Sequence, residues 1–225
     1  MTMEEYTVKV TSVEKVTHDV LKIVTEKPLH FTFTSGQATE ISINKTGWVD
    51  ERRPFTFTCL PDNDYLEFTT KTYPSHKGVT NQLLQLKKGD ELILHDVFGA
   101  IAYQGEGLFI AGGAGITPFI SIFRYLKSKN EIGNNRLLFA NKTKADIIHE
   151  KEFKNLLGDN FINILSDQKA EGYEHGQITE EFLKTQLPVS GNYIYVCGPP
   201  PMMEAIEHYL SDLQVKEKFI IKEEV

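Results

Sequence analysis

The alternation of apolar and polar residues changes its period once along this chain, close to residue 104. Before that point, short stretches with period-two alternation are separated by turn residues, as in half-buried antiparallel strands. They predict strands at 6–13, 20–25, 39–43, 55–59, 65–70 and 91–97, with one helical interruption at 79–86. Six short strands at this spacing favour an antiparallel barrel or sandwich.

After residue 107 the strands are apolar throughout and alternate with helical patterns. The predicted strands are 108–111, 136–140, 161–165, 193–197 and 218–221, and the predicted helices are 119–128, 147–157, 179–186 and 202–213. Continuous apolar strands separated by helices indicate a parallel sheet that is covered on both faces. We therefore predict two domains, 1–104 and 105–225, the second with a five-stranded parallel sheet.

Composition excludes several classes of function. A net charge of -7 argues against nucleic acid as the main partner, because phosphate contacts need clustered Lys and Arg. No apolar run is long enough to span a bilayer, and residues 1–10 have the pattern of a strand rather than a signal peptide. The two cysteines, Cys59 and Cys197, stand far apart with no Cys-x-x-Cys. This spacing predicts no metal site and fits a reducing cytoplasm.

The loop after the strand at 108–111 is suited to a phosphate group. Gly112, Gly113 and Gly115 let the backbone approach a ligand closely, and the following helix offers unpaired N–H groups. Pro118 fits the first helical turn. The standard dinucleotide fingerprint would have glycine in the place of Pro118 and an acidic residue about 20 positions later, and this chain has neither. The alternative is an ordinary glycine turn between a strand and a helix, with no role in binding.

Three further stretches carry candidate chemistry, each with a structural alternative. Arg53 matches a phosphate and Phe55 offers a flat face, but they are also compatible with a surface charge and a core side chain. Gly78 and Thr80 form a second glycine-to-helix junction, or a plain helix cap. Cys197 ends a strand over the same edge as the glycine loop, or is a buried structural thiol.

In this order and spacing, these stretches resemble the motifs of the ferredoxin–NADP reductase superfamily of flavoenzymes, over nearly the whole chain. The matching segments are Arg53-Pro54-Phe55-Thr56, Gly78-Val79-Thr80, Gly113-Ala114-Gly115-Ile116-Thr117-Pro118 and Cys197-Gly198-Pro199-Pro200. The resemblance implies a six-stranded Greek-key barrel that binds FAD, followed by an α/β domain that binds NADH or NADPH. It is nearest to flavodoxin or ferredoxin reductases and to oxygenase reductase components without their iron–sulfur domain.

The implied function is a FAD-dependent NAD(P)H oxidoreductase. Hydride would pass from NAD(P)H to flavin N5, and electrons would then pass to a protein acceptor such as flavodoxin, ferredoxin or an oxygenase component. Two alternatives remain: a reductase of free flavin or small acceptors, and a non-enzymatic flavin- or nucleotide-binding redox sensor. A monomer is expected.

The resemblance also assigns roles to residues. Arg53 would clamp the flavin phosphates, Phe55 would lie against the isoalloxazine, and the Thr56 hydroxyl would approach N5. Cys197 would flank the nicotinamide, and Glu217 is the candidate for an acidic residue that approaches the flavin from the C-terminal end. Thr56, Cys197 and Glu217 are thus the catalytic candidates. The cofactor-binding candidates are Arg53, Pro54, Phe55, Thr56, Thr70, Lys71, Tyr73, Gly78, Val79, Thr80, Gly113, Gly115, Thr117, Pro118, Cys197, Gly198 and Pro199, with Tyr73 or His76 over the adenine.

Two charge patterns bear on specificity. Asp167 follows the third parallel strand, where NADP-specific relatives carry a basic residue, and it would repel a 2′-phosphate, which favours NADH. Lys142 and Lys144 could bind such a phosphate or could simply be solvated. The acidity of the chain disfavours the acidic flavodoxins as acceptors, unless a local basic patch forms from Arg52, Arg53, Lys71 and Lys77.

Overall fold

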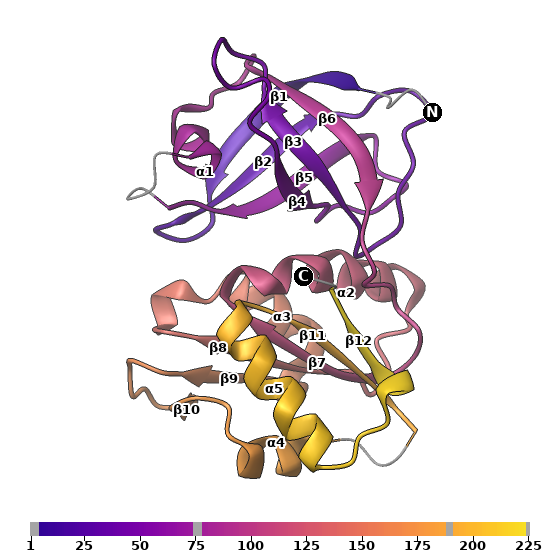
Figure 1. Cartoon of the computed structure of the whole chain (residues 1–225), viewed down its shortest axis with the longest axis vertical. Helices are drawn as coiled ribbons and strands as arrows, with labels where there is room; N and C mark the ends of the chain where they lie inside the picture. Colours follow the sequence, from indigo (N-terminus) through magenta and orange to yellow (C-terminus); the bar gives the residue numbers. More distant parts are fainter. Residues whose placement is uncertain (1–4, 74–77, 188–190, 224–225) are drawn as a thin grey trace.

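The chain folds into two bodies stacked along its long axis, each built on its own β-sheet (Figure 1). We describe a computed structural model, in which residues 5–73, 78–187 and 191–223 are placed. The first body holds an antiparallel sheet and the second a parallel one, as predicted. No helix among these residues is long and apolar enough to cross a membrane.

Six antiparallel strands form the first body, in the order β4-β3-β6-β1-β2-β5. A bridge between Phe57 and Phe68 joins the two ends of this order and closes the barrel. Aromatic rings, among them Phe31 and Phe33, fill the interior. The elements are β1 (Tyr6–Lys15), β2 (Val20–Glu26), β3 (Ala38–Ile43), β4 (Arg53–Thr56), β5 (Tyr65–Lys71), β6 (Glu91–Phe98), the short helix α1 (Val79–Gln82) and a 3-10 turn (Leu83–Gln85).

Two elements of the barrel differ clearly from the prediction, whereas the other five strands agree with it to within two residues at each end. Strand β4 covers Arg53–Thr56 rather than 55–59, and it pairs only with β3. Such an outer position tolerates Pro54, which has no N–H to donate. The helical interruption is a single α-turn followed by the 3-10 turn instead of one helix over 79–86.

The second body is a parallel sheet of six strands, in the order β10-β9-β8-β7-β11-β12. Five strands were predicted; the sixth, β10, has only two residues, both exposed, and therefore no apolar signal. The strands are β7 (Gly107–Gly112), β8 (Arg136–Asn141), β9 (Phe161–Leu165), β10 (Glu174–His175), β11 (Tyr193–Cys197) and β12 (Ile220–Lys222). The helices are α2 (Thr117–Lys129), α3 (Glu150–Leu157), α4 (Glu180–Gln186) and α5 (Pro200–Asp212), with 3-10 turns at Gly113–Ile116, Lys144–Asp146, Gly158–Asn160 and Glu217–Phe219.

Each face of the parallel sheet is buried under two helices. Phe109 and Phe139 point into a core with α2 and α3, whereas Leu108 and Leu138 point into a core with α4 and α5. Val20 of the barrel belongs to the α2 core, so the two bodies share buried apolar surface. Figure 1 shows α2 on the side of the sheet that faces the barrel.

In the sheet, β7 lies between β8 and β11, so the strands that follow β7 first extend the sheet on the side of β8 and later on the side of β11. Ligands of open α/β sheets bind at such a change of direction, outside the carboxyl ends of the strands. The glycine loop follows β7 and Cys197 ends β11, so both predicted nucleotide motifs lie at this point. The predicted domain boundary at 104/105 stays a prediction; it falls between the end of β6 and the start of β7.

Candidate functional site

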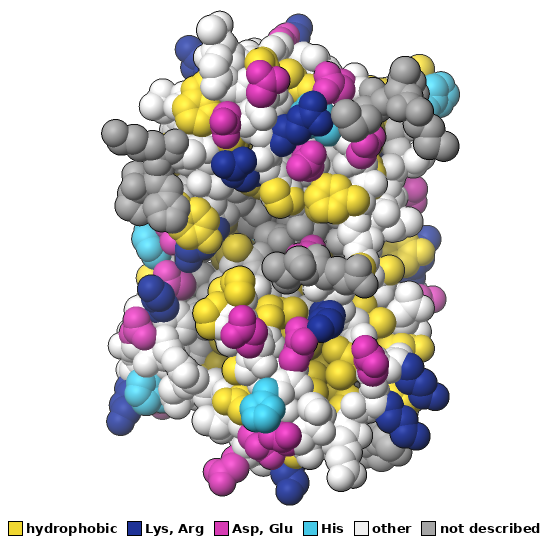
Figure 2. Space-filling model, viewed as in Figure 1, with side chains coloured by type: hydrophobic (Ala, Val, Ile, Leu, Met, Phe, Trp, Pro, Cys, Tyr) yellow, Lys and Arg dark blue, Asp and Glu magenta, His cyan; other side chains and the backbone are white. Residues whose placement is uncertain are grey.

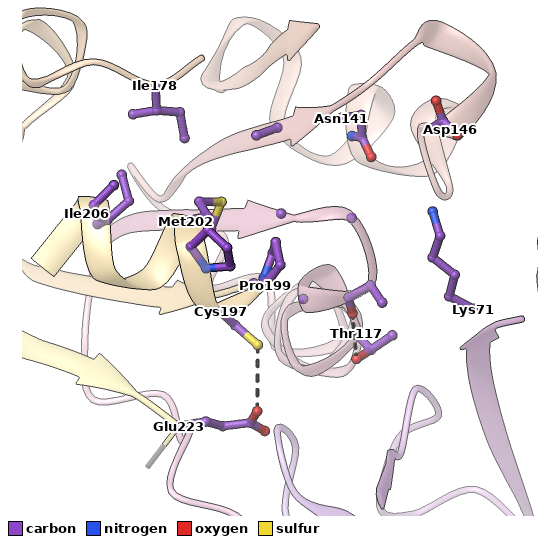
Figure 3. Close-up of a pocket in the computed structure, with 18 of the residues that line it drawn as sticks. Lys71, Thr117, Asn141, Asp146, Ile178, Cys197, Pro199, Met202, Ile206 and Glu223 are labelled. Carbon is purple, nitrogen blue, oxygen red and sulfur yellow. Dashed lines mark hydrogen bonds between the residues drawn. The ribbon is translucent and has the colours of Figure 1, made fainter. Parts of the chain in front are cut away.

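A cavity of about 1020 Å³ lies where the barrel meets the carboxyl edge of the parallel sheet (Figure 3). Small-molecule sites have volumes of roughly 300–1,000 Å³, so this cavity is at the upper end of that range. The barrel and the loops after β7, β8, β9 and β11 all contribute to its wall. The predicted site residues that line it are Pro54, Thr56, Lys71, Tyr73, Gly113, Gly115, Thr117, Cys197, Gly198 and Pro199.

The glycine loop packs too closely against β11 to carry side chains. A Cβ on Gly115 would lie 2.2 Å from the carbonyl oxygen of Cys197. Gly113 has φ +51°, and a Cβ there would meet nothing within 4 Å, so its open side faces the cavity that it lines. Backbone amides in such a loop, at the start of the 13-residue helix α2, are suited to a phosphate group.

One hydroxyl pair links the two bodies inside the cavity. The Thr117 hydroxyl, at the start of α2, lies 3.2 Å from the Thr56 hydroxyl at the end of β4 and donates to the Ala114 carbonyl at 3.0 Å. The flavin motif of the barrel and the nucleotide motif of the sheet therefore touch. This contact puts the two predicted binding segments within reach of each other's ligands.

Opposite this pair, a thiol and a carboxylic acid face each other. The Cys197 thiol donates to Oε2 of Glu223 over 3.9 Å (Figure 3). Burial raises the pKa of Cys197, and the nearby Glu223 carboxylate raises it further, so the thiol stays protonated at neutral pH. Burial also raises the pKa of Glu223, an effect that the bond from Cys197 only partly offsets.

The structure places Glu223 at the cavity wall and the predicted acidic residue, Glu217, away from it. Glu217 is exposed in the 3-10 turn before β12, at the amino end of that strand. Glu223 follows the carboxyl end of β12. Because β12 runs parallel to β11, with Lys222 opposite Val196, Glu223 lies beside Cys197.

Family comparisons agree with this arrangement. The family model described as an FAD-binding domain matches residues 5–105, and the one described as an oxidoreductase NAD-binding domain matches residues 109–208. The chain therefore combines an FAD-binding domain with an oxidoreductase NAD-binding domain, in the two-domain fold of the ferredoxin–NADP reductases. FAD and a nicotinamide nucleotide, the cofactors predicted from the sequence, are the ones that these two domain types bind.

Individual relatives cover nearly all of this chain. It is 29% identical over 229 residues to the reductase component of propane 2-monooxygenase from Mycolicibacterium goodii, covering 92% of this chain and 64% of that protein. It is 30% identical over 224 residues to NADH-cytochrome b5 reductase 2 of Mycosarcoma maydis, covering 90% and 63%. The chain thus spans just under two thirds of each of these proteins.

Solved structures show the same two-domain fold. A ferredoxin NADP+ reductase from Neisseria gonorrhoeae with bound FAD and NADP matches with a TM-score of 0.84 at 16% identity, covering 97% of both chains. The cytochrome b5 reductase domain of Ulva prolifera nitrate reductase matches with a TM-score of 0.82 at 22% identity, also covering 97% of both.

Within this superfamily fold, the flavin motif on β4 departs from the predicted geometry at Phe55. Successive strand residues point to opposite sides, and Phe55 points into the barrel core with an exposed fraction of 8%. Pro54 and Thr56 therefore line the cavity instead. The structural alternative weighed in the sequence analysis applies, and Phe55 is not the side chain at the cavity wall.

Arg53 lies outside the cavity wall but remains available to a phosphate. Its guanidinium donates to the Arg52 carbonyl at 2.5 Å and lies 3.6 Å from Glu51. Both partners of this ion pair are about half exposed, and such surface pairs contribute only about 0–1 kcal/mol. A flavin phosphate could displace Glu51 at little cost.

The remaining flavin candidates are not brought to the cavity. Val79 points into the barrel core, and Thr80 is half-buried on the short helix α1 next to Gly78. Thr70 is buried, with a hydroxyl that has no hydrogen-bond partner among the described residues. His76 and Lys77 lie outside the described residues. The pyrophosphate role of this segment stays a prediction.

On the nucleotide side, Pro118 is buried in the first turn of α2, so its role is to shape the loop. Asn141, at the carboxyl end of β8, was not predicted as a site residue. It lines the cavity, is 8% exposed, and its side-chain N–H₂ group has no partner among the described residues. A buried unpaired donor costs about 1–3 kcal/mol, which a ligand oxygen would recover. Both the open glycine loop and this donor fit a bound nucleotide.

The raised pKa of Glu223 predicts how stability depends on pH. The folded state binds this proton more tightly than the unfolded chain does. The resulting stabilisation is complete below the ordinary glutamic-acid pKa of 4.5 and is lost as the pH rises through the raised value. We therefore expect Glu223→Gln to unfold at higher urea concentration than the unmodified chain near neutral pH, with a difference that vanishes below about pH 4. Glu217→Gln, in the exposed turn at the other end of β12, is the control for the loss of a carboxylate on this strand.

Proposed function

We propose that the chain is a FAD-dependent NAD(P)H oxidoreductase that passes electrons to a protein acceptor. Bound FAD would supply the redox chemistry, because flavin accepts a hydride and can release electrons one at a time. The observation that carries this proposal is the Thr56–Thr117 contact, which joins the two binding segments inside one cavity.

The residues of the chain would bind the two cofactors and orient their reacting rings. The amides of the Gly113–Ile116 turn would receive the nucleotide phosphates, and Asn141 would donate to one of its oxygens. Thr56 would donate or accept a hydrogen bond at the reactive edge of the flavin. The Cys197 thiol, kept neutral by burial, would set the position of the nicotinamide, and the Glu223 carboxyl group would orient the thiol by accepting its hydrogen bond.

A protein acceptor is supported by the relatives, which are named as an oxygenase reductase component and a cytochrome b5 reductase. The described members of the basic patch that would have favoured flavodoxin each pair with a carboxylate. Arg52 pairs with Glu5 at 3.0 Å, and Lys71 pairs with Asp19 at 2.9 Å. Arg53 pairs with Glu51, and Lys77 lies outside the described residues. An acceptor that does not dock through a strongly acidic face is therefore favoured over an acidic flavodoxin, and the named relative points to an oxygenase component.

The deciding experiment is a visible spectrum and a titration. The purified protein, reconstituted with FAD, should be yellow and should bleach anaerobically on addition of NADH. Flavin that binds but is not reduced would support the redox-sensor alternative, and rapid release of reduced flavin would support the free-flavin reductase. A protein that binds no flavin would refute the proposal. A monomer in sedimentation and a cytoplasmic location remain further predictions.

NADH is proposed as the preferred nucleotide. The Asp167 carboxylate accepts a bond from the Ser166 hydroxyl, and the Asp167 amide donates to the Lys142 carbonyl at 2.9 Å, which fixes this acid beside the cavity. Lys144 lies over the Tyr173 ring at 5.2 Å. We expect kcat/KM for NADH to exceed kcat/KM for NADPH by about 10-fold or more. Repulsion of about 1.4 kcal/mol between the Asp167 carboxylate and the 2′-phosphate of NADPH corresponds to a factor of ten. Asp167→Ser should bring kcat/KM for NADPH closer to kcat/KM for NADH, whereas the control Asp159→Ser should leave their ratio unchanged. A preference of the unmodified chain for NADPH would contradict the proposed role of Asp167.

A further inference from the structure

Helix α2 carries a stripe of polar residues on the side that faces the barrel. Thr117, Ser121 and Arg124 are spaced by four and three residues, so they lie on one face of the helix. The rest of the buried helix surface is apolar and packs on the parallel sheet. A polar stripe in such a place needs partners, because unpaired buried polar groups are costly.

All three residues of this stripe bond to one barrel segment, residues 56–59, directly after the flavin motif. Thr117 meets the Thr56 hydroxyl at 3.2 Å, and the Ser121 hydroxyl donates to the Cys59 carbonyl at 2.9 Å. Arg124 donates from Nη1 to the Thr58 carbonyl at 2.7 Å. The helix that begins at the nucleotide loop is thus fastened, along about two turns, to the chain that leaves the flavin strand.

Arg124 is the charged member of the stripe and bonds to carboxylates of both bodies. Its Nη1 donates to Oε1 of Glu67, on β5 of the barrel, at 2.5 Å. Its Nε and Nη2 hold both oxygens of Glu152, on α3 of the α/β body, at 2.7 and 2.9 Å. Glu67 also accepts from the Thr58 hydroxyl at 2.8 Å, so it cannot swing away without breaking a second bond.

The electrostatics of this cluster favour a fixed geometry. Burial alone would lower the pKa of Arg124, but its bonds to Glu152 and Glu67 outweigh burial and raise it. A planar guanidinium with its donors in a rigid fork holds two carboxylates at a set angle, which a lysine cannot do. The cluster therefore orients the two bodies as well as attaching them.

Arg124 does this from outside the ligand cavity. It does not line the cavity, and it lies seven residues along α2 from Thr117, which is about 10 Å at the rise of an α-helix. A change at its barrel partner would tilt the helix without removing a ligand contact. Thr117 and Ser121 cannot serve as such a test, because Thr117 lines the cavity and Ser121 makes a single neutral bond.

We propose that Arg124 is a positioning residue: its bonds to Glu67 and Thr58 fix the angle between the barrel and the parallel sheet, and so hold the nucleotide at reacting distance from the flavin. The expected effect on the rate rests on the proposed function, but the claim that Arg124 fixes the angle between the two bodies does not depend on it. A misplacement of about 1 Å at reacting atoms can cost about 100-fold in rate.

The two carboxylates provide a matched pair of variants. Glu67→Gln weakens the bond that crosses between the bodies, whereas Glu152→Gln weakens a bond within the α/β body. We expect Glu67→Gln to slow the reduction of bound FAD by NADH about 10-fold or more in single-turnover measurements, with the NAD+ dissociation constant within about twofold. Glu152→Gln should stay within about twofold on both quantities. If Glu67→Gln does not fold, Arg124→Lys takes its place and should slow the reduction similarly.

A second readout does not depend on activity. Spin labels on cysteines introduced at the exposed Lys88 of the barrel and Lys154 of α3 report the distance between the bodies in the protein without nucleotide. Glu67→Gln should broaden the distance distribution, and Glu152→Gln should leave it narrow. Equal distributions in the two variants, or equal rates, would overturn the positioning role. If NADH does not reduce the flavin of the unmodified protein, the proposed function is refuted instead. The distance measurement would still test whether the Arg124–Glu67 bond fixes the angle between the two bodies.

Discussion

Gly115→Ala will remove nucleotide binding and destabilise the fold. The added Cβ would lie 2.2 Å from the Cys197 carbonyl oxygen, whereas ordinary contact begins at 3.4 Å, so the backbones must separate by 3.4 − 2.2 = 1.2 Å. Both sides of this contact are backbone, at the ends of β7 and β11, and neither can rotate away. Overpacking of this kind costs about 1–3 kcal/mol, or roughly 2–4 °C in Tm per kcal/mol for a chain of this length.

The same displacement opens the nucleotide cradle. We expect the dissociation constant for NAD+, measured by calorimetry, to rise about 100-fold, because the loop amides and Cys197 no longer converge on one ligand. Gly158→Ala is the control: Gly158 has φ +54°, lies outside the cavity wall, and a Cβ there meets nothing within 4 Å. It should cost stability through backbone strain and leave NAD+ affinity unchanged. Unchanged NAD+ affinity in Gly115→Ala would contradict the cradle.

Much of this site could be predicted because its chemistry lies at strand ends. Glycines and a cysteine that directly follow apolar strands must gather at the carboxyl edge of a parallel sheet, whatever the packing of the helices. The glycine cluster identified the loop at Gly113, and this rule placed it at the same edge as Cys197. The change from period-two to continuous apolar strands separately predicted the division into two bodies.

The same rule would have found Glu223. It directly follows the last strand, just as Cys197 ends its neighbour, whereas Glu217 precedes that strand and must lie at the opposite edge. Glu217 was chosen because the resemblance implies an acidic residue near the C-terminal end, and the choice did not consider at which end of the strand each acidic residue stands. Asn141 was missed for a related reason: at a strand end, an amide is as informative as a glycine when it is buried.

Other features depend on tertiary structure and have no local signal. Alternation along β4 predicts that Phe55 points away from Pro54 and Thr56, but only the closed barrel decides that the side of Phe55 is the inner one. Strand β10 exists because it pairs with Ile164 and Leu165, although Glu174 and His175 are both polar. The stripe on α2 looks like three scattered polar residues until the barrel is placed against it.

Cys197→Ala should slow hydride transfer far more than it weakens binding. The thiol is 7% exposed, lines the cavity, and is flanked by the glycine loop on one side and Glu223 on the other. Its raised pKa keeps it protonated, so it contributes shape and a hydrogen-bond donor rather than a nucleophile. Removing sulfur leaves a gap where the nicotinamide would be pressed toward the flavin, and we expect the reduction of bound FAD to slow about 100-fold.

Cys59→Ala provides the matched comparison, because Cys59 is also a buried free cysteine but belongs to the barrel core. Its sulfur accepts a bond from the Glu67 amide at 3.2 Å, and burial raises the pKa of Cys59 to about 11, so it too is a neutral thiol. That variant should lose about 1–2 kcal/mol of stability and slow FAD reduction far less than Cys197→Ala does. The rate of FAD reduction is measured by stopped flow with NADH, and the affinity for NAD+ by calorimetry. Equal rates in the two variants would show that Cys197 is only a packing residue. Slow reduction in Cys197→Ala with nearly unchanged NAD+ affinity would place the thiol at the reacting ring.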